Sequence, residues 1–219
     1  MTFPETNPDA IIPIFLTYCI DYRYNAISAE FLDEIGYENS YYLSTNAGAS
    51  LPLGYREACR NIKNCRKCHG CNRCNSLNPH NNNCCVGLEK MNDLKKSFVT
   101  NLQIALTLKP IKTVYLLNHQ DCGAIRAFLP CSGYPSVGEV KKKKEIEINA
   151  KILTYGHDFV KRKFTDMEVI LGLIDSNGTV GDYDIKTRKW IIIHVGLGQN
   201  TDALWYGFKQ GDVIESNCQ

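Results

Sequence analysis

Two short motifs carry side chains that could bind a metal ion together. In LTYCIDYRYN, Cys19, Asp21 and Arg23 occupy alternate positions directly after an apolar run. In NHQDCGA, two residues separate His119 from Cys122, so one turn can wrap both around an ion. Two thiolates and one imidazole suit zinc, and three protein ligands leave a fourth position open, as in catalytic zinc sites. The alternative is a buried structural Cys19 and an unrelated HQDC loop.

Asp21 and Arg23 could add an acid–base function beside such a metal. A carboxylate and a guanidinium two residues apart can form a bidentate ion pair. Asp21 could then accept the proton of a zinc-bound hydroxide and fix its orientation. The alternative is an ion pair at the surface end of a strand, which would contribute little to stability.

The pattern of apolar residues predicts the elements that would bring these motifs together. Buried strands are expected in IIPIFLTYCI, SYYLSTNAGAS, KTVYLLNHQDCGA and EVILGLI, and helices over residues 25–36, 88–108 and 139–163. GDYDIKTRKWIIIHV is typical of a hairpin at a sheet edge, while the tail after Gly196 has no firm pattern. This alternation predicts an α/β fold, with a mostly parallel central sheet flanked by helices and an antiparallel edge hairpin. Ligands bind beyond the carboxyl ends of such strands, where both motifs stand.

Length and charge exclude several classes of protein. The 219 residues suit a single domain over residues 1–219, with an aperiodic, cysteine-rich insertion at about residues 54–87. A net charge of +2 does not favour binding to nucleic acid or to an anionic membrane, and Lys141–Lys144 is interpreted as a solvated helix start. Neither a signal peptide nor a transmembrane segment is recognisable, so we expect a cytoplasmic protein.

The insertion contains most of the 11 cysteines. In a chain expected to be intracellular, clustered cysteines favour metal binding over disulfides, and a second, structural zinc site is our interpretation. Disulfides, or an exposed loop without a defined partner, remain alternatives; a ferredoxin-like cluster lacks its usual proline. The cysteines concerned are Cys65, Cys68, Cys71, Cys74, Cys84 and Cys85.

In combination, CIDYR, NAGAS and HQDCGA resemble the β-class carbonic anhydrases. The hallmark of that family is Cys-x-Asp-x-Arg, followed much later by His-x-x-Cys-Gly. TNAGA resembles the family's Asn-Ala-Gly loop, and GDYDIKTRKW resembles its late Tyr-Asp-x-x-Thr-Gly hairpin. The resemblance extends over residues 11–193, with residues 54–87 as an insertion.

The resemblance implies a zinc lyase, a carbonate dehydratase that hydrates CO2 reversibly to bicarbonate and a proton by means of a zinc-bound hydroxide. Cys19, His119 and Cys122 would bind the zinc. Asp21 and Arg23 would form the catalytic dyad, and Asp21 could move onto the metal in a closed state. The family also implies a homodimer or an assembly of dimers. Two thiolates cancel most of the ion's charge, so activity is expected to rise toward alkaline pH.

Departures from the family pattern leave other functions open. Tyr22, Thr45 and Arg188 stand where the family commonly has Ser, Arg and Gly. A non-catalytic zinc-binding protein on the same fold, or a relative that hydrolyses CS2 or COS, is therefore the alternative. His157 and His194 are candidate proton shuttles that no motif ties to the site.

Overall fold

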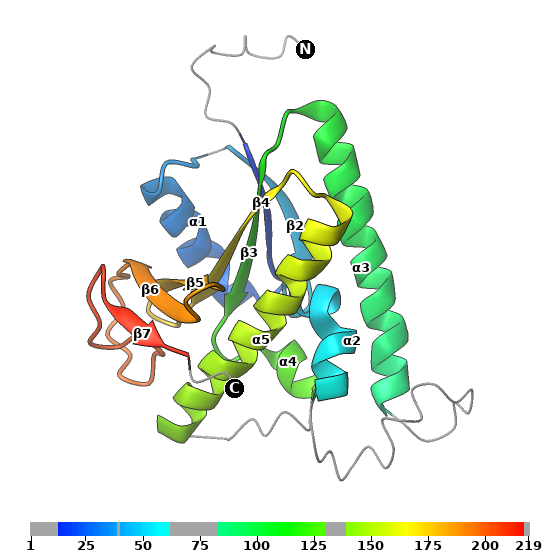
Figure 1. The fold of residues 1–219 in the computed structure, drawn as a ribbon. Coiled ribbons are helices and arrows are strands. Elements are labelled where there is room, and N and C mark those ends of the chain that lie inside the picture. Colours follow the sequence, from blue (N-terminus) through cyan, green and yellow to red (C-terminus); the bar gives the residue numbers. More distant parts are fainter. Residues whose placement is uncertain (1–12, 39, 62–82, 130–138, 217–219) are drawn as a thin grey trace.

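A seven-stranded mixed sheet forms the centre of the structure, a computed structural model that describes residues 13–38, 40–61, 83–129 and 139–216 (Figure 1). The strands are β1 (Ile14–Cys19), β2 (Tyr41–Asn46), β3 (Thr113–His119), β4 (Glu168–Ile174), β5 (Val180–Asp184), β6 (Lys189–His194) and β7 (Val213–Glu215). The helices are α1 (Asn25–Glu34), α2 (Leu51–Asn61), α3 (Asn83–Leu108), α4 (Gly123–Phe128) and α5 (Glu139–Lys163). A short 3-10 helix, η1 (Tyr22–Tyr24), links β1 to α1.

The strand order confirms the predicted α/β architecture. The sheet runs β2-β1-β3-β4-β5-β6-β7; its first four strands are parallel and the last three are antiparallel. The predicted hairpin is present as β5 and β6, but it is not the edge of the sheet, because β7 pairs with β6. A three-residue strand is too short to show an alternating pattern, which is why the tail gave no prediction.

The central strands alternate their side chains between two apolar layers. Tyr115 and Leu117 of β3 pack on the side of α1, with Phe31 and Leu32 of that helix. Val114 and Leu116 point to the other face, toward α2, α3 and α5. Burial on both faces explains the continuous apolar runs of β1 and β3. The predicted helices are present as α1, α3 and α5.

Helix α2 differs from the sequence prediction, which placed an aperiodic insertion from Gly54 onward. Pro52 and Gly54 hide the helix from a sequence-based prediction, because both residues have low helix propensity. Gly54 is needed because a Cβ atom there would lie 2.7 Å from the Cβ of Tyr155 on α5. Helix α3 likewise begins at Asn83 rather than at residue 88.

The second predicted zinc site falls outside the described residues. Cys65, Cys68, Cys71 and Cys74 lie in the segment 62–82, and the side chains of Cys84 and Cys85 are likewise not described. Among the helices that the structure describes, none combines the length and the apolar character needed to cross a membrane.

Candidate metal centre

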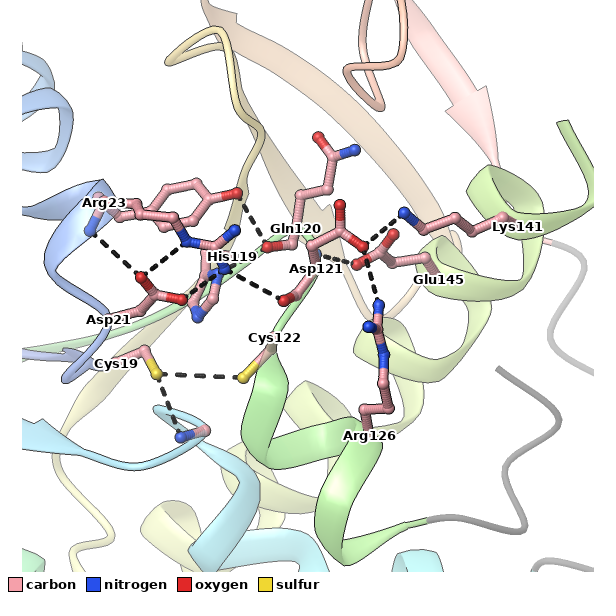
Figure 2. A network of polar contacts seen from close by, with 12 residues as sticks. Cys19, Asp21, Arg23, His119, Gln120, Asp121, Cys122, Arg126, Lys141 and Glu145 are labelled. Carbon is pink, nitrogen blue, oxygen red and sulfur yellow. Dashed lines mark hydrogen bonds and ion pairs between the residues drawn. The ribbon is translucent and has the colours of Figure 1, made fainter. Parts of the chain in front are cut away.

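The ends of two parallel strands bring the predicted ligands together. Cys19 is the last residue of β1 and His119 is the last residue of β3, and the two strands are parallel neighbours. After a two-residue turn, Cys122 directly precedes α4. The three ligand atoms lie within 4.8 Å of one another, and Figure 2 shows the two sulfur atoms facing each other. The site is therefore at the carboxyl edge of the sheet, as predicted.

The geometry of this group is compatible with zinc. All three side chains are buried, and the two sulfur atoms are 4.0 Å apart. Zinc–sulfur bonds of about 2.3 Å in tetrahedral geometry place two sulfurs about 3.8 Å apart. Cys19, His119 and Cys122 could thus hold a metal ion with little movement.

One nitrogen of His119 is held ready for such an ion. The Nδ1 atom lies 2.7 Å from the carbonyl oxygen of Gln120, so Nδ1 carries the proton and donates it. The Nε2 atom is buried and forms no hydrogen bond with any described residue. Tyr24 fixes the ring further: the two ring centroids are 4.3 Å apart, and its hydroxyl donates to the same carbonyl at 2.9 Å. Metal-binding histidines are oriented in this way, through the nitrogen that does not bind the metal.

The two thiols share one proton in the absence of a cation. Their mutual hydrogen bond lowers the pKa of Cys19 well below its ordinary value, with a smaller contribution from His119. The same contact, together with burial, raises the pKa of Cys122 well above its ordinary value. Both sulfurs can be thiolates only if a positive charge replaces that proton. The pair therefore favours a cation at this position.

The NAGAS loop supports the first ligand. The backbone N–H of Gly48 donates to the sulfur of Cys19 at 3.3 Å. Gly48 has a φ of +83°, and a Cβ atom there would lie 2.9 Å from the Cβ of Leu51. Only glycine meets both requirements without strain.

Asp21 and Arg23 form the predicted bidentate pair. Nε of Arg23 donates to one carboxylate oxygen at 2.9 Å, and Nη2 donates to the other at 2.6 Å. The pair holds the pKa of Asp21 below its ordinary value, so the carboxylate is ionised at neutral pH. Arg23 also donates to the carbonyl of Asp121, between the two ligands of the second motif, at 3.4 Å. Only 17% of the Asp21 side chain is exposed, which distinguishes it from an ordinary surface ion pair.

Tyr22 does not obstruct this pair. Its side chain is 82% exposed, so the ring extends into solvent rather than toward the ligands. Figure 2 shows Asp21 and Arg23 joined by dashed lines beside His119. The large residue at this position therefore leaves the dyad geometry intact.

The structure adds supporting residues that the sequence did not indicate. The side chain of Gln120 donates to the carbonyl of Asp202 at 2.9 Å and accepts from the backbone N–H groups of Ser176 and Leu204 at 3.1 and 3.2 Å. These bonds tie the turn after β4 and the segment after β6 to the turn that carries the candidate ligands. The acceptor for Nδ1 of His119 is the backbone carbonyl of Gln120. Because every residue has such a carbonyl, no sequence pattern could have revealed this contact.

The turn itself is strained and is held by charges. Asp121 has a φ of +55°, a conformation that costs a non-glycine residue on the order of 1–3 kcal/mol. Its carboxylate accepts from Lys141 at 2.5 Å and from Arg126 at 3.2 Å, and its backbone N–H donates to Glu145. Glu145 is fully buried and Lys141 is only 16% exposed. The interpretation of Lys141–Lys144 as a solvated helix start is therefore wrong for Lys141, because it pairs with Asp121.

The two candidate proton shuttles contact other residues. His157, on α5, lies 3.1 Å from the carboxylate of Asp158. His194, on β6, lies 2.8 Å from the carboxylate of Glu34 and packs against the ring of Phe31. The described contacts connect neither histidine to the ligand group.

Comparisons with protein-family models, with curated proteins and with solved structures found no match to this chain. The proposals that follow therefore rest on the site itself and on the motifs that compose it.

Proposed function

We propose that the chain is a zinc-dependent carbonic anhydrase that hydrates CO2 reversibly to bicarbonate and a proton. One observation carries the proposal: a buried donor set, with one histidine nitrogen free of hydrogen bonds to the described residues, next to an ionised Asp21–Arg23 pair. The resemblance of CIDYR and HQDCGA to the β-class carbonic anhydrases supports the same conclusion, and with it a fold of that family's type.

Cys19, His119 and Cys122 would hold the zinc. When bound, zinc would act as a Lewis acid that lowers the pKa of a water molecule and so supplies a nucleophile. The carbonyl of Gln120 and the ring of Tyr24 keep the imidazole of His119 in the orientation that this requires. A rigid imidazole reduces the reorganisation that accompanies metal binding.

The role of Asp21 in this proposal is to orient the attacking oxygen. Two hydrogen bonds from Arg23 fix the plane of the carboxylate and keep it ionised, so Asp21 acts as an acceptor and not as a donor. As a hydrogen-bond acceptor at this position, Asp21 would hold the O–H of the attacking group in one direction, which would leave an oxygen lone pair free to face the carbon of CO2. Asp21 and Arg23 are thus the proposed catalytic residues.

A homodimer, or an assembly of dimers, is part of the same proposal. In the described part of the chain, β2 pairs with β1 along one side only, and Leu43 on β2 is 48% exposed. An unpaired strand edge of this kind can extend its sheet into a second copy. Light scattering coupled to gel filtration would detect the doubling of the 24.7 kDa chain mass.

Stopped-flow measurement of CO2 hydration tests the function. Zinc-loaded protein should accelerate hydration above the buffer rate, and Cys122→Ser should lose both the zinc and the acceleration. Asp21→Asn should retain the zinc while kcat/KM falls about 100-fold, because the acceptor that orients the attacking group is lost. A zinc-loaded protein with no acceleration at alkaline pH would refute the carbonic anhydrase assignment.

The same preparation distinguishes the alternatives. Hydrolysis of COS or CS2 without hydration of CO2 would identify a related hydrolase on the same scaffold. Tight zinc binding without any of these activities would indicate a non-catalytic zinc protein. Either outcome replaces the proposed reaction and leaves the metal centre in place.

A further inference from the structure

Helix α5 presents a line of polar side chains to the strand end that carries His119. Lys141, Glu145 and Asn149 are spaced by four residues and therefore lie on one face of the helix. Lys141 pairs with the carboxylate of Asp121, and Glu145 accepts the backbone N–H of the same residue. Figure 2 shows both side chains reaching Asp121 from one helix. Asp121 is thus held by its backbone and its side chain at once.

The third member of the line, Asn149, contacts the residue that precedes His119. The side-chain amide of Asn118 donates to Asn149 at 2.9 Å, and the side chain of Asn149 donates to the carbonyl of Glu145 at 3.0 Å. Asn118 precedes His119, and Asp121 precedes Cys122. Contacts with α5 therefore reach the residue directly before each ligand of the second motif.

The network continues to the loop beside the remaining ligand. The side-chain oxygen of Asn118 accepts from the backbone N–H and the hydroxyl of Ser50, at 3.1 and 2.7 Å. Ser50 lies two residues after Gly48, whose N–H donates to the sulfur of Cys19. Hydrogen bonds thus link α5 to the residue before His119, to the residue before Cys122 and to the loop that supports Cys19.

The burial of this network is difficult to explain by stability alone. Ser50, Asn118, Glu145 and Asn149 are each at most 1% exposed. A carboxylate is expensive to bury, and well-packed apolar side chains often replace buried charged groups without loss of stability. At the position of Glu145, however, an apolar side chain could not accept the N–H of Asp121, which adopts a strained left-handed conformation.

We propose that Glu145 is a positioning residue for the metal ligands. By accepting the backbone N–H of Asp121, it fixes the turn that sets Nε2 of His119 and the sulfur of Cys122 at the spacing a metal ion needs. The inference rests on the metal site of the proposed function, but not on its reaction. It predicts that metal affinity depends on an acceptor at this position rather than on its charge.

Three substitutions in the full-length chain separate these two properties. Glu145→Gln keeps an acceptor of the same length and removes the charge, whereas Glu145→Asp keeps the charge and withdraws the acceptor by one methylene. Glu145→Leu removes both. Zinc affinity is measured by competition with a chromophoric chelator, and ligand geometry by the absorption spectrum of the Co2+-loaded protein. Leu153→Ala, on the same helix but packed in the apolar core, is the matched control for lost stability.

The expected pattern is specific. Loss of a group that orients a metal ligand typically costs 10- to 100-fold in metal affinity. Glu145→Leu and Glu145→Asp should show such a loss with an altered Co2+ spectrum, while Glu145→Gln stays within about threefold of the wild type, since its amide oxygen restores the contact. Leu153→Ala should lower the unfolding temperature without changing affinity or spectrum.

Several outcomes would overturn the inference. Wild-type affinity and spectrum in Glu145→Leu would do so, and so would a Glu145→Gln variant as impaired as Glu145→Asp. If Glu145→Leu does not fold, the zinc affinities and Co2+ spectra of Glu145→Gln and Glu145→Asp still decide between the two outcomes. A wild-type protein that fails to bind zinc would overturn the proposed function as well, whereas normal zinc binding with insensitive variants would overturn the inference alone.

Discussion

Asp182 offers a test of the structure that does not depend on the metal. Its carboxylate accepts a hydrogen bond from the hydroxyl of Tyr115 at 2.6 Å, across the intervening strand β4. Gly172 on β4 makes this contact possible, because a Cβ atom there would lie 2.7 Å from the Tyr115 ring. Burial raises the pKa of Asp182 from 3.8 to about 6, although the hydrogen bond opposes that change. At neutral pH the folded protein must therefore keep an unfavourable buried charge.

Asp182→Asn should stabilise the protein at neutral pH. Because the pKa of Asp182 is higher in the folded state, that state binds more protons than the unfolded state between about pH 4 and pH 6, and stability falls as pH rises through this interval. A difference of about two pKa units corresponds to about 3 kcal/mol, which is the upper limit of the gain. Asparagine removes the charge and keeps an oxygen that can accept from Tyr115.

Urea denaturation of both proteins at two pH values measures this effect. The gain should approach about 3 kcal/mol at pH 7.5 and fall to about 1 kcal/mol at pH 4.5. For a chain of this size, the larger value corresponds to an increase in unfolding temperature of about 6–12 °C. Equal gains at both pH values, or a loss at pH 7.5, would refute the reasoning.

Asp184, two residues further along β5, is a matched control of opposite sign. Hydrogen bonds from the hydroxyl of Thr187 and the backbone N–H of Lys186 lower the pKa of Asp184. A lowered folded-state pKa stabilises the protein above the unfolded-state pKa, and this contribution disappears as pH falls. Asp184→Asn should therefore reduce stability at neutral pH, with a difference that fades in acid.

Three further predictions concern the metal centre. Gly48→Ala should destabilise the protein by about 2 kcal/mol and weaken zinc binding, because the positive φ and the close contact both resist a side chain; denaturation and chelator competition measure the two effects. Tyr24→Phe should cost about 1 kcal/mol through the lost hydrogen bond to Gln120 and leave the zinc stoichiometry, measured by atomic absorption, unchanged. Removing zinc with a chelator should lower the unfolding temperature in a calorimeter, since the ion binds only the folded state; an unchanged temperature would argue against a resident metal.

The ligands could be predicted because their chemistry restricts which residues can serve. A mixed sulfur and nitrogen site needs cysteine and histidine, and both motifs directly follow apolar runs that are typical of buried strands. Cys19 and His119 consequently lie at the predicted sheet edge. The Asp21–Arg23 pair followed from two charges at a spacing that permits a bidentate contact.

The environment of Tyr22 shows where residue type alone misleads. Tyr22, in place of the serine common in the family that the motifs resemble, is one of the departures that leave other functions open. The backbone of η1 instead turns the side chain of Tyr22 into solvent. Its two neighbours, Asp21 and Arg23, still form their ion pair. The direction of a side chain depends on the local backbone conformation, and the residue type at one position does not reveal that conformation.

The supporting residues could not be predicted because their partners are backbone groups distant in the sequence. Lys141 and Glu145 belong to KKKKEIE, a pattern that equally describes a solvated helix face with ion pairs four residues apart. What makes them different is the turn at Asp121, which offers α5 a backbone N–H and a carboxylate together. In the proposed metal centre, two ligands three positions apart must face one point, and the left-handed residue Asp121 lies in the turn that joins them. This turn is held by Lys141 and Glu145, on a helix face that could otherwise have been apolar.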